Sequence, residues 1–392
     1  MDWKPAKINQ DGTVKIPERW LHLYYYESLN ILFRFENALR IFVYIVLKHN
    51  NGKDWDLAVI GENQTIRTET KKRIRQAREH GYLGDDVSSP MLFLNSGELT
   101  QIITSETYWK YFASFFKASK SIVATKLQEI GTVRNALAHF RPIKEDDIDL
   151  LKQNSKHLFI SVENCLVQIT GITDVVPTNT SDVWYRDLKN IGNDRFRTSL
   201  FASRDQARVR LELEYSIPML KKLYYTDDYI SYRVGNLRTA QLLTKYSALR
   251  ESCIYLSENP LYGRVGSEGN ILASKTVSFV FSRLVLEQRI DEIGAAVRDI
   301  AAEVEKETDL ILQDNLARGD LIESQNASAN TNTGSSGNKY WTVSLDNLST
   351  SPLDIDCVEY WGQRWNFVTD FISSVHQYPW MPSSVSKDEL PF

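Results

Sequence analysis

Three side chains with different chemistry lie close together in Arg134-Asn135-Ala136-Leu137-Ala138-His139. A guanidinium recognises phosphate through paired hydrogen bonds, and an imidazole exchanges protons near neutral pH. The carboxamide of Asn135 could orient either the imidazole or the phosphate. This set of side chains suits cleavage at a phosphate, such as that of RNA. Pro142 follows almost at once and cannot continue a helix, so the six residues should close a helix over residues 119–138.

The spacing of an Arg and a His alone says little, because the chain contains it twice. Arg75 and His80 are also five residues apart. Asn135, directly after Arg134, distinguishes the first pair. We expect His80 to lie on a charged, solvated helix, whereas residues 134–139 end a helix with apolar spacing.

The first 170 residues show the periodicity of a helical bundle. Apolar residues recur at steps of three and four from about Arg19 to Lys48, which predicts a long helix with several neighbours. Further helices are expected over residues 65–80, 108–116, 119–138 and 145–166. The aromatic segment 108–116 should contribute to the core.

The helix over residues 65–80 is strongly basic. Its cations are Arg67, Lys71, Lys72, Arg73, Arg75 and Arg78, against the single acid Glu69 between Arg67 and Arg78. We interpret Lys71, Lys72, Arg75 and Arg78 as RNA contacts; a solvated face is the alternative. The formal net charge of the chain is −4, so affinity for nucleic acid has to come from such a local patch.

The pattern changes after residues 171–182, a Thr/Asn/Pro-containing stretch that we interpret as a linker. Residues 208–215 alternate polar and apolar side chains, which indicates a half-buried strand. A long helix should cover 287–317, and the Asn/Ser/Thr-rich segment 324–339 should be a disordered loop. We expect a helical domain over residues 1–172 and an α+β domain over residues 183–392, so the fold class is mixed.

Composition excludes several classes of protein. Hydrophobic residues make up 42% and charged residues 24% of the 392 residues, as in globular proteins. No stretch is long and apolar enough for a membrane span. Three cysteines without metal-site spacing favour a reduced, cytoplasmic protein.

The helical region resembles the HEPN family (higher eukaryotes and prokaryotes nucleotide-binding), many of whose members are ribonucleases with an Arg-x4–6-His motif. The resemblance rests on Arg134, Asn135 and His139, and on a long early helix containing Glu36 and Arg40. It implies a metal-independent endoribonuclease with Arg134, Asn135 and His139 as catalytic residues and no cofactor. It also implies RNA as substrate, a homodimer through the helical domain, and a role in toxin action, antiviral defence or RNA processing.

The helix geometry is consistent with a dimeric site. Residues five apart on a helix are separated by about 140° around its axis, so Arg134 and His139 should not share a face. Glu36 and Arg40 could support the site or form a simple intrahelical ion pair. The motif could also be a plain helix end, since a His there suits the helix dipole. The rival function is a catalytically inactive HEPN-type module for dimerisation or RNA binding. A regulatory partner or ligand would then act through the C-terminal domain as a sensor.

Overall fold

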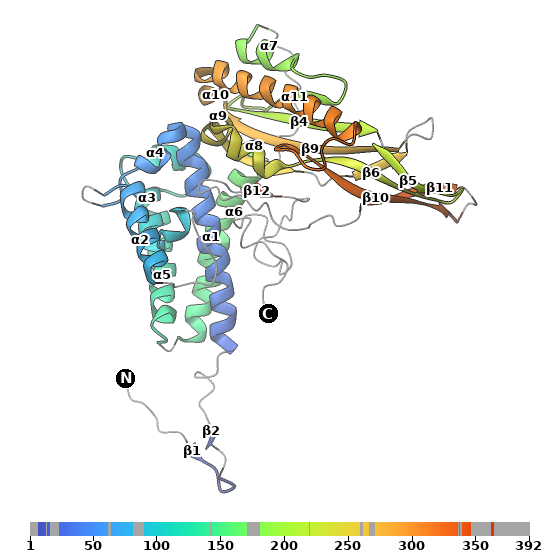
Figure 1. Cartoon of the computed structure of the whole chain (residues 1–392). Helices are drawn as coiled ribbons and strands as arrows, with labels where there is room; N and C mark the ends of the chain where they lie inside the picture. The colour runs from blue at the N-terminus through green and yellow to red at the C-terminus, as the bar shows by residue number, and fades with distance from the viewer. Residues whose placement is uncertain are drawn as a thin grey trace.

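The computed structural model describes residues 7–12, 14–15, 23–61, 64–80, 90–141, 143–170, 181–218, 220–258, 262–265, 271–335, 337, 339–345 and 362–363. Its first part is a helical bundle and its second part combines two antiparallel sheets with helices (Figure 1). The predicted mixture of an all-α bundle and an α+β region is therefore confirmed. The expected limits of the two domains, 1–172 and 183–392, stay predictions.

The bundle contains six α-helices among the residues described. They are α1 (Leu23–Asn51), α2 (Ile66–His80), α3 (Ser96–Thr104), α4 (Trp109–Phe112), α5 (Lys120–Ala138) and α6 (Glu145–Thr170). Short 3-10 helices connect them: η2 (Gly52–Leu57), η3 (Pro90–Phe93) and η4 (Ala113–Phe115). A two-stranded hairpin, β1 (Lys7–Ile8) and β2 (Val14–Lys15), precedes the bundle.

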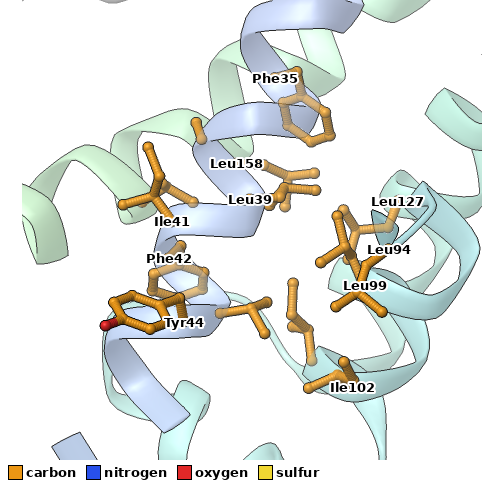
Figure 2. Close-up of a cluster of buried hydrophobic side chains, with 14 of the residues drawn as sticks. Phe35, Leu39, Ile41, Phe42, Tyr44, Leu94, Leu99, Ile102, Leu127 and Leu158 are labelled. Atoms are coloured by element: carbon orange, nitrogen blue, oxygen red, sulfur yellow. The ribbon is translucent and has the colours of Figure 1, made fainter. Parts of the chain in front are cut away.

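Helix α1 is the centre of the bundle. Every residue from Ile41 to Leu47 is at most 2% exposed, so two turns of α1 are buried on all sides. Figure 2 shows Phe35, Leu39 and Phe42 of α1 within the cluster that Leu94, Leu99, Ile102, Leu127 and Leu158 complete. The apolar stripe of α1 is wide in the sequence because neighbouring segments cover this helix on several sides.

The aromatic segment 108–116 contributes to the same core. The Phe112 ring is fully buried, and its centroid lies 5.3 Å from that of Phe42. The segment is not one helix, because α4 ends at Phe112 and η4 follows it.

The second part begins with α7 (Val183–Lys189) and is built on a six-stranded sheet in the order β12-β7-β9-β4-β3, with β8 also paired to β9. Its strands are β3 (Phe196–Ala202), β4 (Arg208–Pro218), β7 (Cys253–Glu258), β8 (Tyr262–Val265), β9 (Ile271–Ser282) and β12 (Gly362–Gln363). Helices α8 (Thr239–Lys245), α9 (Ser247–Ser252), α10 (Arg283–Gln288) and α11 (Ile290–Leu312) accompany it. The helix expected over 287–317 is α11, and the alternating segment 208–215 lies within β4.

A second sheet has the order β11-β10-β6-β5. It consists of β5 (Lys221–Tyr225), β6 (Tyr229–Leu237), β10 (Ile322–Thr333) and β11 (Lys339–Leu345). The expectation of a disordered loop at 324–339 was wrong, because β10 and β11 form a hairpin there. Three residues of β10 are fully buried, Ile322, Ala327 and Ala329, and Ile322 is the one large apolar side chain among them. Because the segment contains few apolar residues, the sequence pattern did not indicate this strand.

The two parts share helix α1. Ile254, Tyr255 and Val280 of β7 and β9 belong to the same apolar core as the buried face of α1. The buried Lys48 of α1 donates hydrogen bonds to the backbone oxygen of Arg250 and the hydroxyl of Tyr44, at 2.9 Å each. The helix that carries Glu36 and Arg40 thus also contacts the C-terminal sheet.

Candidate active site

The end of α5 has a well-defined backbone geometry. His139 is the C-cap residue, and its N–H is donated to the oxygen of Asn135 at 3.2 Å. The next two N–H groups complete a Schellman motif: Phe140 donates to Leu137 at 3.0 Å and Arg141 to Ala136 at 2.8 Å. This reversal leaves His139 exposed at the surface.

Phe140 occupies the position of that motif where glycine is usual. Its φ is +53° and its side chain is 89% exposed. A side chain with a Cβ in this left-handed conformation costs about 1 kcal/mol or more. Nothing in residue type or spacing signals this conformation of Phe140 in the sequence.

The structure brings Arg134 together with the two candidate supporting residues of α1. The Arg134 Nε lies 3.7 Å from Glu36 Oε2, and the other Glu36 oxygen is bound by the guanidinium of Arg40. Side-chain exposure is 35% for Arg134 and 12% for both Glu36 and Arg40. One carboxylate therefore serves two guanidiniums, and Arg134 is the one that still reaches solvent.

Arg40 is fixed in place. Besides Glu36, it donates to Asn37 Oδ1 at 3.0 Å and, from two nitrogens, to the backbone oxygen of Leu94 at 3.2 and 3.0 Å. Burial lowers the pKa of Arg40 from its ordinary value, Glu36 opposes that shift, and the charge of Arg134 adds to it. The intrahelical ion pair expected between Glu36 and Arg40 is thus one part of a larger cluster.

Asn135 lies beside Arg134 on α5. Its Oδ1 accepts a hydrogen bond from Arg134 Nη1 at 3.4 Å, and its side chain is exposed. Arg134, Asn135 and His139 therefore all reach the surface near the end of α5, whereas Glu36 and Arg40 lie behind Arg134.

The cations of α2 fall into two groups. Arg67 forms a paired ion contact with Asp56 at 2.8 and 2.7 Å. Arg73 binds Glu98 at 2.6 and 2.8 Å and donates to the backbone oxygen of Phe93 at 2.6 Å. Arg67 thus connects α2 to η2, and Arg73 connects α2 to η3 and α3.

The other four cations, Lys71, Lys72, Arg75 and Arg78, are exposed and line a surface hollow of about 540 Å³. Thr68, Ile74 and Glu79 complete the hollow, and Glu79 pairs with Arg75 at 3.8 Å. These four are the residues that the sequence predicted as RNA contacts.

The basic helix and the Arg134 cluster meet at one turn. Arg73 of α2 donates to the oxygen of Phe93, and Arg40 of α1 donates to the next oxygen, that of Leu94. The turn leads into α3, whose N-terminus is closed by a capping box between Asn95 and Glu98. The contacts that fix α2 relative to α1 therefore involve Arg40, a residue of the candidate site.

One group of three carboxylates lies elsewhere, at Glu303, Glu307 and Asp320. Glu307 is buried and accepts hydrogen bonds from the N–H groups of Asp320, Leu321 and Ile322 at 2.7 to 2.9 Å. Its oxygens stabilise the start of β10.

Among the helices described, none is long and apolar enough to cross a membrane.

Comparison with known proteins finds one similarity, in the helical region. No curated protein and no solved structure matches the chain. A family model described as Swt1-like HEPN matches residues 30–163, and the C-terminal region matches no family model. The match spans α2 and most of α1 and α6, together with α3, α4 and the whole of α5, including the Arg134–His139 motif. A HEPN domain indicates a nuclease or RNA-binding module. The resemblance drawn from the sequence is confirmed over residues 30–163, which match the Swt1-like HEPN model.

Proposed function

We propose that this protein is a metal-independent endoribonuclease whose active site is built around Arg134 and His139. The observation that carries the proposal is the pairing of Arg134 with Glu36, within 3.7 Å, one turn before the exposed His139. A guanidinium held on one side by a carboxylate and open to solvent on the other can bind a phosphate without losing its orientation.

The reaction would be an attack of a ribose 2′-hydroxyl on the adjacent phosphorus. An imidazole takes the proton of the 2′-hydroxyl, the new P–O2′ bond forms, and the P–O5′ bond breaks. The leaving 5′-oxygen takes a proton from an acid, and a 2′,3′-cyclic phosphate results. His139 would act as base or acid, and Arg134 would stabilise the charge of the phosphorane.

Glu36 and Arg40 would position Arg134 rather than touch RNA. Arg40 is fixed by Asn37 and the Leu94 oxygen, and it holds Glu36, which in turn holds Arg134. Asn135 would orient the Arg134 side chain or the phosphate, since its Oδ1 already accepts from Arg134.

A second copy would complete the site. The helical step between Arg134 and His139 turns the two side chains about 140° apart. Two copies that face each other through the ends of α5 would supply two histidines, one as base and one as acid. Lys71, Lys72, Arg75 and Arg78 would hold RNA through its phosphates.

Incubation of the purified protein with labelled RNA in EDTA tests this proposal. Wild type should cut to a 2′,3′-cyclic phosphate, identified by mass, whereas Arg134→Ala and His139→Ala should lose at least about 100-fold in rate, as for loss of a general base. His80→Ala, at the repeated spacing, should cut as wild type does. Equal cutting by wild type and both motif variants, or none by wild type, would instead favour an RNA-binding or dimerisation module. Native mass spectrometry should show a dimer, and a strict monomer that cuts would contradict the composite site.

A further inference from the structure

We infer that Phe140 is a base-stacking residue, so that the RNA is cut beside an unpaired nucleotide whose base lies on the Phe140 ring. This inference rests on the proposed function, because it assigns a role next to His139 in RNA cleavage. It comes from two properties of Phe140 that packing and helix termination do not require.

The first property is the backbone. Phe140 has a φ of +53° at the glycine position of the Schellman motif. A Phe there is strained by its Cβ, whereas glycine would satisfy the same two hydrogen bonds without strain. Backbone strain of this kind concentrates at functional sites.

The chain itself provides a comparison. Helix α11 ends with the same motif: Asp314 donates to Ile311 at 3.0 Å and Asn315 to Leu310 at 2.9 Å. The residue at the corresponding position is Asp314, with a φ of +58°. Asp tolerates this conformation better than most residues because its short polar side chain bonds locally. The use of a large aromatic residue at the end of α5 therefore needs a separate reason.

The second property is exposure. At 89%, Phe140 is the most exposed of the large hydrophobic residues described, and the next, Tyr224, reaches 59%. The fold does not use this ring in its core. The ring stands between the exposed His139 and Arg141, at the point where the chain reverses.

These properties fit a nucleobase as partner. An aromatic face stacks any base, and such contacts are sequence-tolerant. Bases within an A-form duplex are already stacked and cannot reach the ring, whereas splayed bases in loops and single strands can. With His139 at the ribose and Arg134 at the phosphate, the neighbouring Phe140 can hold the base of the same step and so strengthen the binding of the RNA.

Full-length Phe140→Gly separates this role from a structural one. Glycine relieves the strain, so the melting temperature should equal or exceed that of wild type. On a single-stranded oligonucleotide, KM should rise roughly tenfold, the loss expected when one base loses its stacking partner, with kcat little changed. Phe140→Trp should behave as wild type, and Phe140→Leu should resemble Phe140→Gly. Asp314→Gly, at the matching position of α11, should leave KM unaltered.

A second readout does not require cleavage. RNA with 2-aminopurine beside the scissile step should lose fluorescence on binding to the full-length His139→Ala protein, because stacking quenches it. His139→Ala combined with Phe140→Gly should abolish that quenching. If wild type cuts while Phe140→Gly keeps the wild-type KM and quenching, the inference fails and the ribonuclease proposal stands. If wild type does not cut, that proposal fails, and quenching alone decides the role of Phe140. If Phe140→Gly turns a dimer into a monomer, the ring docks on a second copy and the base-stacking role is overturned.

Discussion

At the residue scale, the most consequential contact is the sharing of Glu36 between Arg40 and Arg134. Replacing Glu36 by Gln removes the carboxylate that both guanidiniums share, while Arg40 stays 12% exposed. Breaking a buried pair on one side costs about 3–5 kcal/mol, and the partial exposure here reduces this to roughly 2 kcal/mol. We expect Glu36→Gln to lower the free energy of urea unfolding by that amount. RNA cleavage should fall as well, because Arg134 loses its orientation.

Glu79→Gln is the matched control for this prediction. Glu79 also pairs with an arginine four residues away, Arg75, but both side chains are more than half exposed. Its replacement should change stability by less than about 0.5 kcal/mol. Equal unfolding curves for Glu36→Gln and wild type would show that the cluster around Arg40 carries no net stability.

At the element scale, α2 shows what a sequence can and cannot predict. The pattern located a basic helix at 65–80, and α2 covers Ile66–His80. It could not separate Arg67 and Arg73 from the other cations on structural grounds, because their partners Asp56 and Glu98 lie 11 and 25 residues away. The prediction for β10 was wrong for a related reason: its pairing with β6 is nonlocal, and its composition resembles that of a loop. The site motif was found because its residues are adjacent, whereas Phe140 escaped because its conformation leaves no compositional trace.

The two groups of cations on α2 should respond differently to substitution. Alanine at Lys71, Lys72, Arg75 and Arg78 together should weaken RNA binding. It should reduce the slope of log affinity against log salt by up to about 3, since single-stranded RNA releases about 0.7 counterion per contact. The melting temperature should hardly change, because the four side chains are exposed. Arg73→Ala should do the reverse and destabilise the protein, because Glu98 and the Phe93 oxygen lose their partner. Binding by fluorescence anisotropy at several salt concentrations checks this; an unchanged slope would exclude α2 as the RNA contact.

At the scale of the whole molecule, α1 joins the candidate site to the C-terminal sheet. Lys48 is 2% exposed and links α1 to the carbonyl oxygen of Arg250. Lys48→Ala should cost about 2–4 kcal/mol through the cavity and the unpaired polar groups. Since the core of α1 continues into β7 and β9, hydrogen exchange should accelerate in both parts together. Lys306→Ala, on the exposed side of α11, should have almost no effect. Faster exchange confined to the bundle would show that the two parts unfold independently.

The same junction should make stability depend on pH. His49 of α1 is half-buried near Arg208 and Asp205 of the β3–β4 hairpin. Burial, and secondly the charge of Arg208, lower the pKa of His49 below its ordinary 6.5, while Asp205 opposes them. The unfolded chain then binds a proton at a higher pH than the folded chain. The stability of the native state should therefore fall as pH drops below about 6.5, by at most about 1.4 kcal/mol per pH unit for one group.

Asp205 should not contribute to the change of stability over this range of pH. Burial acts to raise its pKa, but hydrogen bonds from Ser203 and Ala207 and the charge of Arg208 bring it below the ordinary 3.8, so its contribution is lost only in stronger acid.

Chemical unfolding between pH 5 and pH 7.5 should show a smaller loss of stability in His49→Gln than in wild type, whereas His157→Gln, on the exposed face of α6, should follow wild type. Identical profiles for wild type and His49→Gln would mean that His49 takes up its proton over the same pH range in the folded and unfolded states. If the profiles differ as expected, mild acid weakens the contact between α1 and the C-terminal sheet, and cleavage measured at the same pH values would show whether the site around Glu36 responds.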